Sequence, residues 1–231
     1  MNRGSGTQPV FARPQALQGL GSRLPVWDEL YLVCHDYDSG APRVHVGALG
    51  IGLAGATLID LLLNQQVALR DGRVSILEPQ VRGDVIADAA LSGLRQGPRM
   101  PAVSVWLRQF AGSGGLYERV RAQLVARGLL RRQRRRMRED RYPPVDTTWT
   151  IRAQARLRSV LYGHEAADHQ AAALAGLVDA LGAPSLLGMA EPDQKVSHGL
   201  RVVASAHLPP VRYVIGCVAE GVGDHATAAY R

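Results

Sequence analysis

A single apolar segment constrains the fold of this chain more than any other feature. Residues Val46–Leu63 contain one charged side chain, Asp60, and four glycines, and they lead directly into a polar turn. A membrane-spanning helix needs roughly 20 apolar residues in a row. The glycines and the polar turn favour instead a helix that is buried in the core of a protein.

The residues after this helix predict a β-hairpin. Two alternating segments, residues 67–69 and 74–76, flank Asp71-Gly72, a dipeptide typical of tight hairpin turns. A helix followed by a ribbon occurs again, with a more basic composition, at residues 116–143. We call residues 131–142 of this second copy the arginine ribbon.

Hydrophobic periodicity predicts further helices along the chain. One covers residues 83–94, with Asp84 as a candidate N-cap, and the others cover residues 103–110, 116–127, 149–161 and 168–181. Residues 27–35 are compatible with a helix or a strand. Residues 211–218 are compatible with a strand or a core helix.

Positive charge is concentrated in the arginine ribbon. The chain has a formal net charge of +7, a pI of about 10.0, and one lysine, Lys195, among 27 basic residues, which is typical of a GC-rich bacterial genome. The ribbon holds Arg131, Arg132, Arg134, Arg135, Arg136, Arg138 and Arg141 against Glu139 and Asp140, a surplus of five positive charges. Such a ribbon is either a solvated edge that prevents strand aggregation or a surface that binds phosphate, from lipid headgroups or nucleic acid.

Residues 50–55 match the G-x-G-x-x-G pattern that is typical of dinucleotide-binding proteins. Asp71 follows at about the distance of a ribose-binding acid, roughly 20 residues. A Rossmann unit needs a parallel strand after its helix, whereas Asp71-Gly72 joins two adjacent segments as an antiparallel hairpin. We therefore interpret the glycines as positions where helices pack closely.

A helix followed by a basic hairpin is also the outline of a winged-helix DNA-binding protein. A recognition helix must be polar and basic to enter the major groove. Residues 53–63 are too apolar for that role. The second helix offers Glu118, Arg119, Arg121 and Arg127, so nucleic-acid binding stays an alternative.

Candidate catalytic and metal-binding groups are few. The chain has no G-x-S-x-G sequence, and His164 and His169 are five residues apart, so they do not share one helical face. Asp36 and Asp38 flank Tyr37 in a segment typical of a turn. We expect no catalysis, no metal and no cofactor.

The two cysteines, Cys34 and Cys217, form no C-x-x-C pair, which favours a reducing cytoplasm over an oxidising compartment. We expect Cys34 in the core and His35 on the surface. Residues 1–23 lack the apolar stretch of a signal peptide and are expected to be a disordered leader.

Several segments carry a resemblance when taken in order. They are LYLVCHDYDSG at residues 30–40, GLAGATLIDLLL at 52–63 leading to VAL at 67–69 and DGRV at 71–74, Gly83-Asp84, LVARGLL at 124–130 and RYP at 141–143. In this order they resemble the Golgi phosphoprotein 3 family, particularly its bacterial, actinomycete-type members. The resemblance covers roughly residues 24–187.

The resemblance implies a mainly α fold, a single helical domain with inserted β-hairpins, at residues 24–190. Residues 191–231 then form a C-terminal segment of open role. It also implies a cytoplasmic, non-catalytic peripheral membrane protein that binds phosphatidylinositol 4-phosphate. Eukaryotic relatives also retain glycosyltransferases, so a protein client is a second kind of partner.

The resemblance also points to individual residues. The tryptophan and three arginines of the family's headgroup pocket fall at His45, at Ala54 and near Gly114 and Tyr117, none of which retains the family residue. Arg43, His45 and Arg119 lie close by in sequence and are the candidate headgroup ligands. The family's second hairpin, which takes part in oligomerisation and membrane contact, corresponds to the arginine ribbon.

We therefore expect docking on an anionic membrane surface through Arg131, Arg132, Arg134, Arg135 and Arg136, with a headgroup bound near Arg43, His45 and Arg119. A homo-oligomer through the second hairpin and a protein adaptor are further expectations for its partners.

Overall fold

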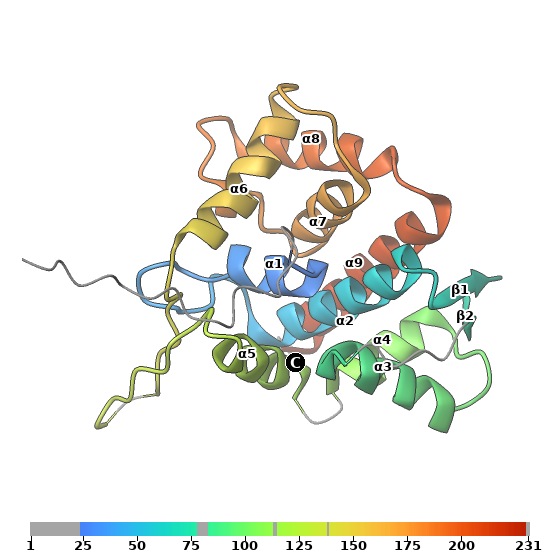
Figure 1. The fold of residues 1–231 in the computed structure, drawn as a ribbon. Helices are drawn as coiled ribbons and strands as arrows, with labels where there is room; N and C mark the ends of the chain where they lie inside the picture. The colour runs from blue at the N-terminus through green and yellow to red at the C-terminus, as the bar shows by residue number, and fades with distance from the viewer. Residues whose placement is uncertain (1–23, 78–82, 113–114, 138, 230–231) are drawn as a thin grey trace, which may run out of the picture.

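The apolar segment forms the central helix of the molecule, α2 (Val46–Leu63). The computed structural model describes residues 24–77, 83–112, 115–137 and 139–229. Within these ranges α2 is surrounded by α1 (Val26–Val33), α4 (Val103–Gly112), α7 (His169–Ala180) and α9 (Pro209–Ala229) (Figure 1). The other elements are β1 (Val67–Arg70), β2 (Arg73–Ile76), α3 (Val85–Gln96), α5 (Leu116–Ala126), α6 (Thr148–Leu161), the 3₁₀ helix η2 (Pro184–Leu187) and α8 (Asp193–Ser205).

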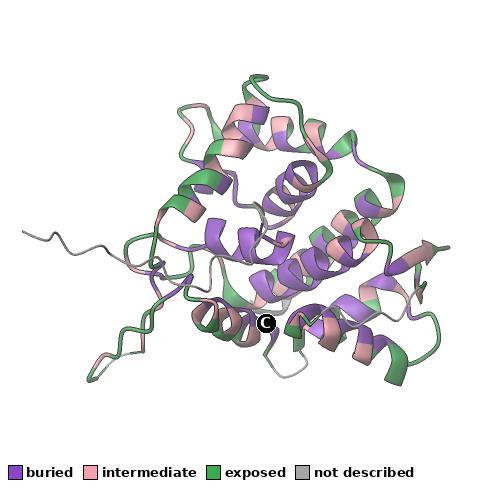
Figure 2. Ribbon diagram, viewed as in Figure 1, coloured by how far each residue is buried: buried purple, intermediate pink, exposed green. Residues whose placement is uncertain are grey.

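The core is built on α1, α2 and α7, where most residues are buried (Figure 2). In the described part of the chain, α2 is the one helix long and apolar enough to cross a membrane, yet 67% of that 18-residue window is buried inside the protein. Burial of this kind is what the glycines and the polar turn predicted for a core helix.

The glycines of α2 allow α9 to lie against it in the opposite direction. A side chain at Gly55 would overlap Val218, and a Cβ at Gly221 would lie 3.3 Å from Ile51. On its other side Gly52 faces Leu181, at 3.2 Å from the position of an added Cβ. These contacts lie inside a continuous helix and not at a strand-to-helix turn, so the interpretation of the glycines as packing positions is confirmed.

The first hairpin forms as predicted, from β1 and β2. The strands pair antiparallel, with Val67 opposite Ile76 and Leu69 opposite Val74. Asp71 and Gly72 have φ angles of 49° and 69°, the positive values that a type I′ turn requires.

The predicted N-cap at Asp84 is confirmed, and the structure adds a second N-cap at Asp168. Asp84 accepts hydrogen bonds from the backbone N–H groups of Ile86 and Ala87, at 2.9 and 3.1 Å, and so caps α3. Asp168 caps α7 by accepting from the N–H of Ala171 at 2.8 Å. The two undecided segments are mainly helical. Residues 27–33 lie within α1, which ends before Cys34 and His35, and residues 211–218 lie within α9.

The arginine ribbon leaves the helical body as an extended hairpin, seen at the lower left of Figure 1. Its two sides pair through isolated antiparallel bridges, Leu130 with Pro144 and Gln133 with Arg141, and its described residues form no continuous strand. Gln133 and Arg141 exchange both backbone hydrogen bonds, at 2.8 and 3.0 Å. The predicted hairpin is therefore present, although it is less regular than the first.

Contacts at its base hold the ribbon on the body. The Arg121 guanidinium lies 4.1 Å from the ring centroid of Tyr142, a cation–π contact. Gly40, with φ of +66°, lies so close to the backbone of Tyr142 and Pro143 that a side chain there would overlap it. The ribbon is thus attached to both α5 and the turn that precedes α2.

The fold is therefore mainly α with inserted hairpins, as predicted. The segment after residue 190 contributes α8 and α9, which pack on α7 and α2. Residues 1–23, for which a disordered leader was predicted, lie outside the described residues.

Candidate anion-binding site

The site begins at the N-terminal end of α2, where His45 is the N-cap. Its Nδ1 atom accepts a hydrogen bond from the backbone N–H of Gly47, at 3.2 Å. Both His45 and the nearby Arg43 are exposed. Their place at this helix end follows from the turn at residues 36–40, in which Asp36 Oδ1 accepts from the Ser39 N–H and hydroxyl, both at 2.7 Å, as the Asp-rich sequence predicted.

A second histidine reaches this position from α9. The Nε2 atom of His225 lies 3.2 Å from His45 Nδ1, and the two ring centroids are 5.0 Å apart. The His225 ring occupies the space over Gly47, where any side chain would overlap it. Two imidazoles from opposite ends of the chain therefore meet over the first turn of α2.

The two histidines line a cavity of about 440 Å³. Its polar lining residues are Arg43, His45, Ser185 and His225. The other lining residues are apolar: Val44, Ala48, Leu181, Gly182, Ala183, Leu186, Val222 and Ala226. None of these lining residues is acidic. The cavity therefore presents cationic and hydrogen-bonding groups beside an apolar surface.

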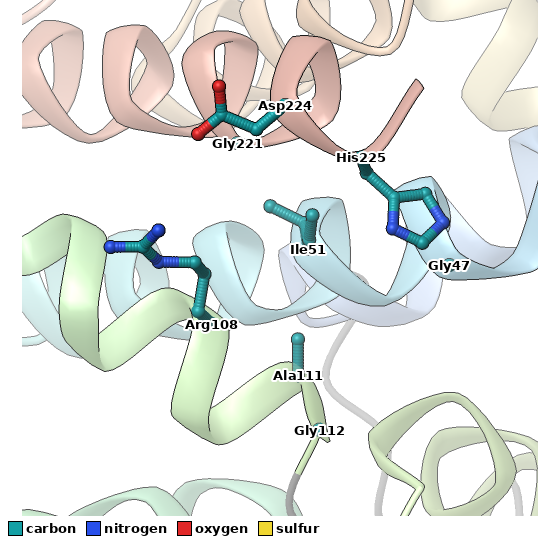
Figure 3. A pocket seen from close by; sticks show the side chains of 8 residues that line it. All are labelled: Gly47, Ile51, Arg108, Ala111, Gly112, Gly221, Asp224 and His225. Atoms are coloured by element: carbon teal, nitrogen blue, oxygen red, sulfur yellow. The ribbon is translucent and has the colours of Figure 1, made fainter. Parts of the chain in front are cut away.

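His225 also lines a neighbouring cavity of about 400 Å³ between α2, α4 and α9, shown in Figure 3. Gly47 and Ile51 come from α2, Ala111 and Gly112 from the end of α4, and Gly221 from α9. This cavity carries charges of both signs, from Arg108 and Asp224.

The structure brings together two of the three predicted headgroup residues. Arg43 and His45 line the 440 Å³ cavity, whereas Arg119 is not among the residues that line either cavity. Ala54 is fully buried and Tyr117 is almost so, so neither of these family pocket positions is open to a ligand. Gly114 lies outside the described residues.

His225 was missed by sequence reasoning. It belongs to the C-terminal segment, whose helix was not recognised beyond residue 218, and 180 residues separate it from His45. The available signal was the spacing of Val218 and His225, seven residues and so two helical turns apart, which places them on the same face.

The arginine ribbon is largely open to solvent. Arg131, Arg132, Arg134, Arg136 and Arg141 are exposed, Arg135 is half-buried, and Arg138 lies outside the described residues. Arg132 donates to Asp140 at 2.6 Å, and this hydrogen bond lowers the pKa of Asp140. Among the described residues this is the one ion pair of the ribbon, so most of its guanidinium groups are available to an outside anion.

The ribbon carries an apolar residue as well. Met137 lies in its turn and is 95% exposed. Through Gly40, the base of the ribbon touches the turn that leads to Arg43, three residues further on, which is at most about 11 Å along an extended chain. The base of the ribbon and the cavity at His45 therefore lie on neighbouring parts of the molecule.

The prediction that His35 lies on the surface is wrong. His35 is 5% exposed, with its Nδ1 2.6 Å from the carbonyl oxygen of Tyr31 and its Nε2 2.8 Å from the hydroxyl of Tyr117. Its ring stacks on that of Tyr31 at a centroid distance of 3.8 Å. Burial lowers the pKa of His35 to about 4, so the ring is neutral and inside the core.

Cys34 is in the core, as predicted. It is fully buried, and burial raises the pKa of its thiol to about 12. A thiol in this state is not a reactive nucleophile.

Two arginines that nucleic-acid binding would use already form ion pairs with side chains of this protein. Arg127 pairs with the buried Asp28, and Arg121 pairs with Glu118 while lying over Tyr142. A recognition helix needs its basic side chains free to reach base edges. The geometry of α5 therefore does not favour the winged-helix alternative.

Comparison with known proteins bears on the whole helical body. A search of curated proteins gives no match to this chain. The model of the family described as Golgi phosphoprotein 3 (GPP34) matches residues 26–216, from the first residue of α1 to the middle of α9. Because this match covers most of the chain and includes the central helix and both hairpins, the protein belongs to the Golgi phosphoprotein 3 family.

Proposed function

We propose that this protein is a non-catalytic, cytoplasmic peripheral membrane protein that docks on anionic lipid through the arginine ribbon. A phosphate-bearing headgroup, phosphatidylinositol 4-phosphate by family resemblance, binds in the cavity beside Arg43 and His45. The observation that carries the proposal is the projecting ribbon, whose exposed arginines have one internal carboxylate partner among the described residues.

The chemistry of the ribbon suits a phosphate surface. Guanidinium groups bind phosphate oxygens in pairs of parallel hydrogen bonds. The exposed Met137 adds an apolar group that can enter the interface between headgroups and acyl chains. A basic residue near an acidic membrane contributes about 1 kcal/mol, so several arginines give weak and reversible docking that salt reduces.

The test is sedimentation with phosphatidylserine vesicles at low salt. Replacing Arg134, Arg135 and Arg136 by glutamate should weaken binding by at least about 100-fold, because three attractions of about 1 kcal/mol are lost and repulsion is added. The matched control replaces Arg70, Arg99 and Arg212, which are exposed arginines on other parts of the surface, and changes the net charge equally.

Binding that survives reversal of the ribbon, or that both triple variants lose equally, would contradict the proposal. Retention on duplex DNA that exceeds retention on vesicles at matched salt would support nucleic acid as the partner instead. Self-association or capture of a protein through the ribbon would resist salt better than vesicle binding, and would indicate an adaptor.

A further inference from the structure

We propose that His225 is a ligand of the headgroup cavity, and that with Arg43 and His45 it forms a site for a phosphomonoester. The inference rests on the proposed function and adds to it a residue outside the family-matched segment, which ends at residue 216. The site is thus completed by the C-terminal half of α9.

The position of His225 follows from regular helix packing. Along the contact between α2 and α9, Gly55 faces Val218, Ile51 faces Gly221 and Gly47 faces His225. Steps of three or four residues on each helix keep one face toward the partner. Because Val218 is fully buried, it holds α9 in a register that brings the His225 ring to the first turn of α2.

The hydrogen bonds determine what the two rings can offer. His45 Nδ1 accepts from the N–H of Gly47, so this nitrogen carries no proton and the N–H of its neutral ring is at Nε2. The short approach of His225 Nε2 to the same acceptor then requires His225 to donate. An imidazolium donates from both ring nitrogens, so His225 in that form can hold His45 through its Nε2–H and offer its Nδ1–H to a ligand, beside the Nε2–H of His45.

The surroundings of the pair favour an anion. Arg43 and Ser185 line the same 440 Å³ cavity, and no acidic residue of the described chain is among its lining residues. The carboxylate of Asp224 instead lines the adjacent cavity, together with Arg108. A volume of this size is within the range of small-ligand sites, and the wall formed by Leu181, Leu186 and Val222 can pack on the carbon skeleton of the ligand.

Soluble inositol 4-phosphate tests the site without a membrane. Its addition should shift the imidazole NMR signals of His45 and His225 and leave those of the exposed His164 and His198 unchanged. Glycerophosphoinositol, a phosphodiester, should bind more weakly, because it offers one fewer charged oxygen. Absence of binding, or shifts at other histidines alone, would overturn the inference.

Two variants test whether binding needs the His225 ring itself and whether it needs that ring in its observed position. His225→Ala should weaken inositol 4-phosphate binding about tenfold, which is the usual scale for one hydrogen bond to a charged group. Gly47→Ala should weaken it similarly, because the new side chain displaces the His225 ring. His164→Ala, at an exposed histidine that lines neither cavity, is the control and should bind as the wild type does. Unchanged affinity in His225→Ala would overturn the inference.

Vesicles distinguish this inference from the proposed function. On vesicles of equal charge, His225→Ala should lose the preference for phosphatidylinositol 4-phosphate and keep its docking on phosphatidylserine. The ribbon variant should lose both. If the wild type binds soluble inositol 4-phosphate but no vesicle, the site stands as one for a free phosphomonoester and the membrane proposal fails.

Discussion

At the scale of single residues, His35 shows how neighbours decide burial. Because Asp36 and Asp38 follow His35 in a turn, the sequence predicts that His35 lies on the surface. In the structure its two ring nitrogens lie within hydrogen-bond distance of the Tyr31 carbonyl oxygen and the Tyr117 hydroxyl, and its ring stacks on that of Tyr31. A buried polar ring is tolerated when its hydrogen bonds are made inside the protein.

This burial predicts a pH-dependent contribution to stability. The pKa of His35 falls from 6.5 to about 4 on folding. Between these pH values the imidazole is protonated in the unfolded chain and neutral in the folded chain. The contribution is complete above pH 6.5 and is lost as the pH falls toward 4, by ~3 kcal/mol in all. Urea unfolding of the wild type and of His35→Gln, compared between pH 7 and pH 4.5, measures it.

The quantity to measure is the difference in unfolding free energy between the wild type and His35→Gln at each pH. Burial also raises the pKa of Asp28, to about 7, and that contribution has the opposite sign, since it is lost as the pH rises. It is common to both proteins and cancels in the comparison. Parallel pH profiles for wild type and His35→Gln would show that His35 does not titrate as described.

At the scale of elements, the contact between α2 and α9 depends on the absence of side chains at particular helical positions. Glycine normally destabilises a helix relative to alanine, by roughly 1 kcal/mol. Here that cost is offset, because removal of the side chain lets two helices approach closely and bury both faces.

Two glycine substitutions test this balance. Gly55→Ala should destabilise the protein by roughly 1–3 kcal/mol, because its methyl group overlaps Val218. Gly93→Ala, on the exposed face of α3 with nothing within 4 Å, should stabilise it by about 0.5–1 kcal/mol. Urea midpoints measure both, and a stabilising Gly55→Ala would mean that α9 does not lie where the structure has it.

At the scale of the whole molecule, the family match ends inside α9 while the packing continues beyond it. Cys217 and Val218 are buried against the body after the last matched residue. His225 follows on the same helix. The C-terminal segment, whose role the sequence leaves open, is therefore structurally part of the helical body.

Two truncations separate packing from ligand binding. A chain that ends at Gly216 should lose about 3 kcal/mol or more, because it lacks the buried Cys217 and Val218. A chain that ends at Gly223 keeps both and should stay within about 1 kcal/mol of the full chain, yet it should bind inositol 4-phosphate as weakly as His225→Ala. Thermal unfolding with and without the ligand checks both expectations, and equal stability of the two truncated chains would contradict them.

The sequence by itself determined the elements whose causes are local. The periodicity of apolar residues predicted the helices, Asp84 predicted where one of them begins, and Asp71-Gly72 predicted the first hairpin. The arginine ribbon was also visible, because seven arginines in twelve residues are a local fact. Each of these depends on residues only a few positions apart.

Only the tertiary structure decided which distant side chains meet. The His45–His225 pair spans 180 residues, and the burial of His35 depends on Tyr117, 82 residues away. Such contacts follow from the angle and register at which helices pack, and these depend on every side chain in the interface together. The spacing of residues along the chain predicts the buried face of a single helix. It does not predict the register in which two helices pack against each other.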